Sequence, residues 1–314
     1  MKSVIIYGNC HTTAIKQVLK CIPEFNEKYV ILNTKPIQDI KTVEELYSLP
    51  FEKCNVFIHQ SIWSKNRYGP EYASENLIKR LSPNCKVIAI PNLYHMPLCF
   101  FPQYSSEREL NYRGNTIFFR DKILDDAFLN HQSLKQTVAQ YTNQDLFDSE
   151  TIRAGFNAFI EKVKIRECDW DIKISSFLVN NYKGKRLFFD PNHPTGAVIF
   201  YIVEELLQIL LPEIIVSNEW KNNTYYTMDT FEMPVTESVI YALNLNGGGY
   251  TSVLRKSPNG IKLINTDMNL LQYIKQYWIM EWSNKEVPFL RRAGCFIIWF
   301  IYKVAGKLKE SCKS

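Results

Sequence analysis

The chain has 314 residues, 46% of them hydrophobic and 22% charged, a balance that is ordinary for a globular protein and argues against disorder. The net charge of +5 is carried entirely by the segment from Arg291 onwards, so the body is neutral and a nucleic-acid-binding function is disfavoured. The eight cysteines form no CxxC pair, which argues against a zinc knuckle and for free thiols in a reducing cytoplasm.

Short apolar segments alternate with helical patterns over the first 90 residues. Strands are predicted at residues 4–7, 29–32, 55–62 and 86–90, and helices at 10–21, 43–49 and 71–81. The first strand begins too early for a signal peptide to precede it. Short apolar strands that alternate with helices are typical of a parallel sheet covered on both faces, so the pattern predicts an α/β fold.

The periodicity weakens after residue 94. Residues 94–147 are rich in Phe, Tyr, Asn and Arg, and we expect an insertion with short helices that forms a lid or substrate wall. Further helices are predicted at 149–167, capped by Ser149, at 169–181, at 196–211, capped by Thr195, and at 234–245 and 265–282. With a fifth strand at 185–189, the expected fold is a five-stranded parallel sheet with helices on both faces, in a domain over 1–245 followed by an extension over 246–314.

The bend Gly8-Asn9-Cys10-His11 follows the first strand and opens a helix. Free N–H groups at a helix start stabilise an anion, so a thiolate at Cys10 is a candidate nucleophile. Cys10 as a small packing residue is the alternative, because free cysteines are often buried.

The segment Asp190-Pro191-Asn192-His193-Pro194 follows the fifth predicted strand. An Asp three residues before a His can accept from the imidazole Nδ1–H and leave Nε2 as a base. The alternative is an ordinary turn, because Asp-Pro and Asn are common turn formers. The carboxyl ends of parallel strands meet at one edge, so this loop and the Cys10 bend are expected to lie together.

Other polar residues follow the predicted strands. Asn92 could donate to an oxyanion or form a turn. His59 and Gln60 lie near the end of the third strand, where His59 could equally be a core residue. His11 adjoins Cys10, but a helix turns about 100° per residue and can direct it elsewhere. The five histidines show no paired ligand spacing, so no metal site is expected.

The order of these motifs resembles the SGNH/GDSL hydrolase superfamily, with Cys10 in the place of its serine. More specifically, YGNC at 7–10, IPNLY at 90–94 with Phe101-Pro102 behind it, and LFFDPNHPT at 187–195 resemble the WcbI-type polysaccharide-biosynthesis family over residues 3–245. This resemblance implies an SGNH-like layered fold and a coenzyme A-binding acetyltransferase of capsule assembly. The chain departs from the family in carrying His11 where glutamine is expected.

The resemblance also implies roles for these residues. Cys10 would attack the thioester of acetyl-CoA or be positioned for direct transfer, and His193, oriented by Asp190, would act as the base. Backbone N–H groups from Gly8 to Cys10, with Asn92, would hold the oxyanion, beside further substrate contacts from Asn9, His11, His59 and Gln60. The candidates for the coenzyme's phosphates, each also explained as surface charge, are Arg113, Arg120, Lys183, Lys185 and Arg186.

Within a predicted helix over residues 291–309, an apolar run at 293–302 is flanked by basic residues. It is too short to span a bilayer, which requires about 20 apolar residues. We expect a helix that lies on an anionic membrane surface, or one that docks on the body or on a second subunit. The expected location is cytoplasmic, with peripheral contact at the inner membrane, and the oligomeric state is left open.

Three functions fit this reading. The first is an O-acetyltransferase that acts on a glycan or lipid-linked sugar of a capsular or other surface polysaccharide. A cysteine-based esterase or thioesterase would use the same site with water as acceptor. The third is a non-catalytic coenzyme A- or glycan-binding subunit of a biosynthetic complex.

Overall fold

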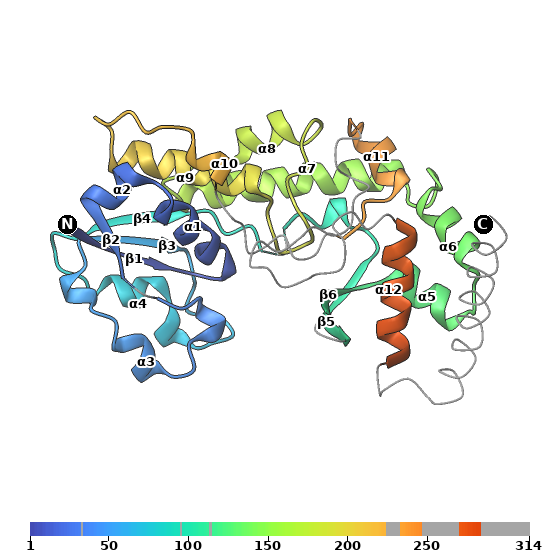
Figure 1. The fold of residues 1–314 in the computed structure, drawn as a ribbon, viewed down its shortest axis with the longest axis horizontal. Helices are drawn as coiled ribbons and strands as arrows, with labels where there is room; N and C mark the ends of the chain where they lie inside the picture. The colour runs from blue at the N-terminus through green and yellow to red at the C-terminus, as the bar shows by residue number, and fades with distance from the viewer. Residues whose placement is uncertain (33, 95, 113–114, 224–232, 247–269, 284–314) are drawn as a thin grey trace, which may run out of the picture.

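The computed structural model describes residues 1–32, 34–94, 96–112, 115–223, 233–246 and 270–283 (Figure 1). The predicted helix at 291–309 and the first residues of the one at 265–282 lie outside these ranges. None of the described helices is long and apolar enough to cross a membrane.

Four strands form the parallel sheet, in the order β2-β1-β3-β4. Their bounds are β1 Lys2–Tyr7, β2 Tyr29–Ile31, β3 Val56–Gln60 and β4 Lys86–Ile90. Tyr7 pairs with His59, and Gln60 pairs with Ile90, so β1, β3 and β4 end at the same edge. The first four predicted strands are confirmed.

Alternating side chains of β1 enter two separate cores. Val4 and Ile6 pack in the larger core with helices α1 (Cys10–Lys20) and α9 (Gly196–Leu210). Ile5 and Tyr7 pack in the smaller core with α3 (Val43–Tyr47) and α4 (Ser74–Ile78). Figure 1 shows α9 above the sheet and α3 and α4 below it, so apolar packing covers both faces as the sequence predicts.

The prediction of a fifth strand at residues 185–189 is wrong. Residues 185–189 make a single bridge, between Phe188 and Pro194, and do not join the sheet. Their carbonyl groups are satisfied in other ways: the Arg186 guanidinium donates to the oxygens of Phe188 and Phe189, and Met233 N–H donates to Phe189 as well. The segment is therefore an irregular buried loop that leads into α9.

The insertion contains a β-hairpin that was not predicted. Strands β5 (Tyr104–Tyr112) and β6 (Asn115–Asp121) pair antiparallel, with register shifts along the ladder. The short helices α5 (Lys122–Leu129) and α6 (Leu134–Tyr141) agree with the prediction. Figure 1 places the hairpin beside α12 (Leu270–Ser283), between that helix and the parallel sheet.

The remaining helices differ from the prediction mainly at their starts. Helix α7 (Ser149–Arg166) is capped by Asp148 rather than Ser149, because the Asp148 carboxylate accepts from Thr151 N–H at 2.8 Å. Helix α8 (Ser175–Asn181) begins later than predicted. Thr195 stands at the N-cap position of α9, but its hydroxyl donates to the carbonyl of Arg186 instead of capping the helix. The other helices are α2 (Pro23–Lys28), α10 (Trp220–Asn223) and α11 (Glu237–Leu243).

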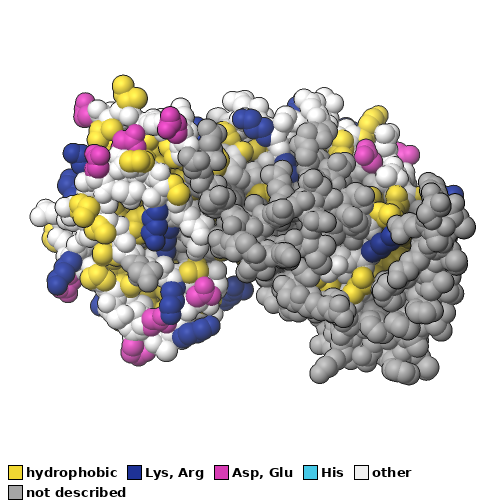
Figure 2. Space-filling view, viewed as in Figure 1, with side chains coloured by type: hydrophobic (Ala, Val, Ile, Leu, Met, Phe, Trp, Pro, Cys, Tyr) yellow, Lys and Arg dark blue, Asp and Glu magenta, His cyan; other side chains and the backbone are white. Residues whose placement is uncertain are grey.

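Short 3₁₀ helices complete the fold: η1 Ile37–Asp39, η2 Phe51–Lys53, η3 Pro70–Tyr72, η4 Leu98–Phe100 and η5 Glu167–Asp169. On the described part of the face in Figure 2, basic and acidic side chains are interspersed, in keeping with the neutral body.

Candidate active site

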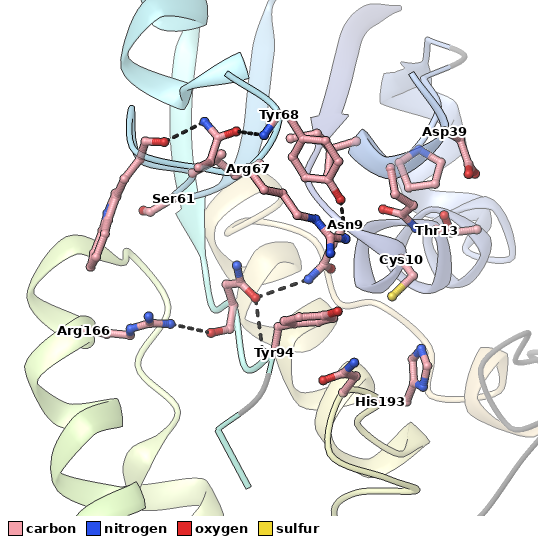
Figure 3. A pocket seen from close by; sticks show the side chains of 18 of the residues that line it. Asn9, Cys10, Thr13, Asp39, Ser61, Arg67, Tyr68, Tyr94, Arg166 and His193 are labelled. Carbon is pink, nitrogen blue, oxygen red and sulfur yellow. Dashed lines mark hydrogen bonds between the residues drawn. The ribbon is translucent and has the colours of Figure 1, made fainter. Parts of the chain in front are cut away.

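Cys10 and His193 face one cavity of about 920 Å³ at the carboxyl edge of the sheet. Cys10 is the first residue of α1 and follows β1 after two residues. His193 comes from the loop before α9. Figure 3 shows the Cys10 sulfur and the His193 ring facing the same space. The structure therefore brings together the two motifs that the sequence separates by more than 180 residues.

The bend before Cys10 requires glycine. A Cβ on Gly8 would lie 2.4 Å from Oε1 of Gln60 and 2.7 Å from the Thr12 methyl carbon. The same Oε1 accepts from Asn9 N–H at 2.8 Å, which ties the bend to the end of β3. Asn9 in turn caps α1, because its Oδ1 accepts from His11 N–H at 3.0 Å. These contacts fix the position of the thiol at the helix start.

Asp190 and His193 form a buried pair. Asp190 Oδ2 accepts from His193 Nδ1 at 2.7 Å, and Oδ1 accepts from the backbone N–H groups of Asn192 and His193, each at 2.8 Å. The carboxylate is 1% exposed, whereas the imidazole is 20% exposed. This arrangement orients the ring so that Nε2 is the nitrogen available to the cavity.

The pKa of His193 is raised to about 10. Burial acts in the opposite direction, but the charge of Asp190, its hydrogen bond and a hydrogen bond with the Cys10 side chain outweigh it. The ring is therefore an imidazolium at neutral pH and lies within hydrogen-bonding reach of the thiol. The thiol and the imidazole are therefore the candidate nucleophile and the candidate acid–base group of one site.

Asn92 lies at the cavity, and its Oδ1 accepts from Asn9 Nδ2 at 3.3 Å and from Tyr94 N–H at 3.2 Å. His59 does not line the cavity. Its ring stacks on Phe57 in the core on the other face of the sheet, and burial lowers its pKa.

His11 and Gln60 are buried behind the cavity wall. His11 is 2% exposed, and its Nε2 lies 2.6 Å from the carbonyl oxygen of Asn192. Its Nδ1 lies 3.3 Å from Gln60 Nε2. Burial, reinforced by the charge of His193 and partly offset by the Asn192 carbonyl, lowers the pKa of His11 to about 4, so the ring is neutral. Neither residue is placed to contact a substrate.

Aromatic side chains form much of the cavity wall: Trp63, Tyr68, Tyr94, Phe119 and Trp170. Phe119 comes from β6, and its ring centroid lies 6.2 Å from that of His193, so the hairpin of the insertion reaches the site as a wall. The carboxylates of Asp39 and Asp169 also line the cavity.

The family model for the polysaccharide biosynthesis enzyme WcbI matches residues 3–211. The chain belongs to the WcbI family. It is therefore a member of an enzyme family of polysaccharide biosynthesis. The chain is also similar to a solved structure of WcbI, with a TM-score of 0.69 at 16% sequence identity, over 97% of this chain and 95% of the other. That structure is described as native WcbI, a novel polysaccharide biosynthesis enzyme, without a disulfide bond between coenzyme A and one of its cysteines. No curated protein matches the chain.

Of the cations that sequence reasoning assigned to the phosphates of coenzyme A, the four that the structure describes do not line the cavity of this WcbI-family chain. Arg113 lies outside the described residues. Arg120 pairs with Asp125 of the insertion and with Glu281 of α12. Lys183 and Lys185 are exposed elsewhere, and Arg186 is buried against backbone carbonyls.

Three other cations line the cavity instead: Lys65, Arg67 and Arg166. Arg166 Nη1 donates to the carbonyl of Asn92 at 3.4 Å, and its guanidinium lies 5.5 Å from the Trp63 ring. Two of these cations follow the end of β3, a position that could have revealed them from the sequence. Arg166 gave no such signal, because it lies at the far end of α7. Among the described residues, no cluster of His, Cys, Asp and Glu could hold a metal ion.

Proposed function

We propose that the chain is an acetyl-CoA-dependent O-acetyltransferase that acts on a sugar of a capsular or other surface polysaccharide. The observation that carries this proposal is the cavity in which Cys10 meets an imidazole oriented by Asp190. Membership of the WcbI family supplies the polysaccharide context. The description of the solved WcbI structure, which refers to a bond between coenzyme A and a cysteine, supports a thiol close to that carrier.

Cys10 and His193 can carry the acyl group through two balanced steps. The Cys10 thiolate attacks the thioester carbonyl, the carbon–sulfur bond to coenzyme A breaks, and the leaving thiolate takes the proton of the His193 imidazolium. Neutral His193 then accepts the proton of a sugar hydroxyl as its oxygen attacks the acetyl group on Cys10. The second step restores the thiolate and the imidazolium. Direct transfer from coenzyme A to the sugar would need His193 as base and Cys10 only as a positioning group.

The oxyanion of both steps requires hydrogen-bond donors near Cys10. The N–H of Cys10 stands at the first position of α1, where the helix itself provides no acceptor. Asn92 also lines the cavity, and its Oδ1 accepts from Asn9 and Tyr94, so a donor role falls to its amide nitrogen. We assign these two groups to the oxyanion.

The lining cations are suited to the phosphate groups of coenzyme A. Lys65, Arg67 and Arg166 replace the earlier candidates, and Trp63 offers a ring face for the adenine. The aromatic wall around Tyr94 and Phe119 is left for the sugar acceptor. The acceptor could reach this part of the cavity next to His193.

The test is incubation of the purified full-length chain with isotopically labelled acetyl-CoA and a chemically deacetylated surface polysaccharide. The proposal predicts labelled acetyl esters on the glycan by mass spectrometry. Labelled acetate that forms at the same rate without glycan would instead identify an esterase or thioesterase. Coenzyme A binding with neither product would identify a non-catalytic binding subunit.

A further inference from the structure

We propose that His11 is a positioning residue that fastens the loop of Asp190 and His193 to the helix of Cys10. This inference rests on the proposed function, because it concerns the alignment of the same thiol and imidazole. His11 adjoins Cys10 in α1 and contacts Asn192, the residue before His193. It therefore links the two halves of the site behind the cavity wall.

The hydrogen-bond network assigns the protons of His11. Gln60 Oε1 accepts from Asn9 N–H, and Gln60 Nε2 donates to the carbonyl of Pro91 at 3.1 Å, so the amide of Gln60 has one orientation. Gln60 Nε2 therefore donates its second hydrogen to Nδ1 of His11. Because Nδ1 is an acceptor in the neutral ring, Nε2 carries the hydrogen and donates it to the carbonyl of Asn192 at 2.6 Å.

The loop depends on such side-chain contacts. Among the described residues, its strand-like pairing is limited to the bridge between Phe188 and Pro194. The Arg186 guanidinium holds the base of the loop, and His11 holds its far end at Asn192. Asn192 is 4% exposed, so water cannot easily replace a lost donor at its carbonyl.

His11 is distinguished from a catalytic group by its surroundings. It does not line the cavity, and its neutral ring is committed to two hydrogen bonds. Its role is to hold Asn192, and thereby the adjoining His193, at a fixed distance from Cys10.

Two substitutions separate the two hydrogen bonds of His11. The amide nitrogen of glutamine lies about where imidazole Nε2 lies, so H11Q keeps the donor to Asn192. The amide oxygen of asparagine lies about where Nδ1 lies, so H11N keeps only the acceptor for Gln60. The proposal predicts that the kcat of H11Q is close to that of the parent chain, whereas the kcat of H11N is lowered. H131N is the matched control, because His131 is exposed.

The experiment combines acetyl-transfer kinetics with alkylation of Cys10 by iodoacetamide. The alkylation is carried out from about pH 5 to pH 10 and is read out by peptide mass spectrometry. H11N should lower kcat by about tenfold or more, leave coenzyme A affinity within about twofold, and slow the alkylation of Cys10. H11Q should restore both, and circular dichroism should show that all variants are folded.

Each outcome has a distinct meaning. If H193A slows the alkylation of Cys10 but H11N does not, His11 is not a positioning residue, and the catalytic pair stands. If H11Q and H11N lose kcat equally, the donor to Asn192 is not the decisive contact, and the inference is overturned. If H193A leaves the alkylation profile unchanged, the proposed pair of Cys10 and His193 itself fails.

Discussion

The two halves of the candidate site are positioned by different means. Cys10 stands between a strand that pairs with a neighbour on each side and a helix, so regular backbone structure determines its place. His193 stands on an irregular loop whose shape depends on the side chains of Arg186, Asp190 and His11. A buried polar contact is costly to break, so the second half should be more sensitive to substitutions that leave the sheet intact.

The largest effect is expected from the thiol itself. We predict that C10A lowers acetyl transfer by about 10⁴-fold or more, because the nucleophile is lost while the cavity remains. Coenzyme A binding, measured by calorimetry, should change little. C168A serves as the control, because Cys168 is an exposed free thiol. Equal losses in both variants would show that the effect is not specific to the site.

The next effect concerns the orienting carboxylate. D190N removes the charge that raises the pKa of His193, so that pKa should fall towards its ordinary value of 6.5. Transfer should decrease by about 10²- to 10³-fold. D169N is the control, since Asp169 also lines the cavity but lies on η5.

The same substitution should alter stability in a defined pH window. A raised pKa of His193 stabilises the folded chain fully below about pH 6.5, and this contribution is lost as the pH rises towards 10. The difference in Tm between the parent chain and D190N should therefore shrink across that window. A difference that grows with pH would contradict the assignment.

The position of Cys10 can be disturbed by a substitution at Gly8, in the bend before it. An added Cβ in G8A would meet the Gln60 side chain and Thr12, so the bend or Gln60 must shift. We predict a loss of about 1–3 kcal/mol in unfolding free energy and a clear decrease in kcat. G184A is the matched control, because nothing lies within 4 Å of a Cβ at Gly184. Equal Tm values for the two variants would refute the close approach.

The smallest effect on the chemistry is expected at the base of the loop. R186M removes the donor to the carbonyls of Phe188 and Phe189, which should cost about 1–3 kcal/mol in chemical denaturation. K185M, at the exposed neighbouring position, should stay close to the parent chain. If R186M is as stable as K185M, the loop does not depend on its guanidinium.

The contrast between the two halves also explains what could be predicted from the sequence. The apolar strand, the glycine and the helical pattern after Cys10 are local signals, and they placed the thiol correctly. The spacing of Asp190 and His193 is also local. The preceding segment was mistaken for a strand because its apolar residues suit any buried backbone, and its partners Arg186 and Met233 act through tertiary contacts.

The cavity wall was the least predictable part. The hairpin carrying Phe119 lacks a clean alternation of apolar and polar residues, and register shifts interrupt its ladder. The role of Arg166 depends on the packing of α7 against the Asn92 loop, which no short motif encodes. Such residues become visible only when distant segments are assembled.

The central claim is that Cys10 and His193 act together to acetylate a surface glycan. The most direct measurement is the O-acetyl content of the polysaccharide in cells that lack the gene and are complemented with the parent chain, C10A or H193A. We predict that the parent chain restores the acetyl esters and that both variants, expressed at equal levels, fail. Full restoration by both variants would contradict the account.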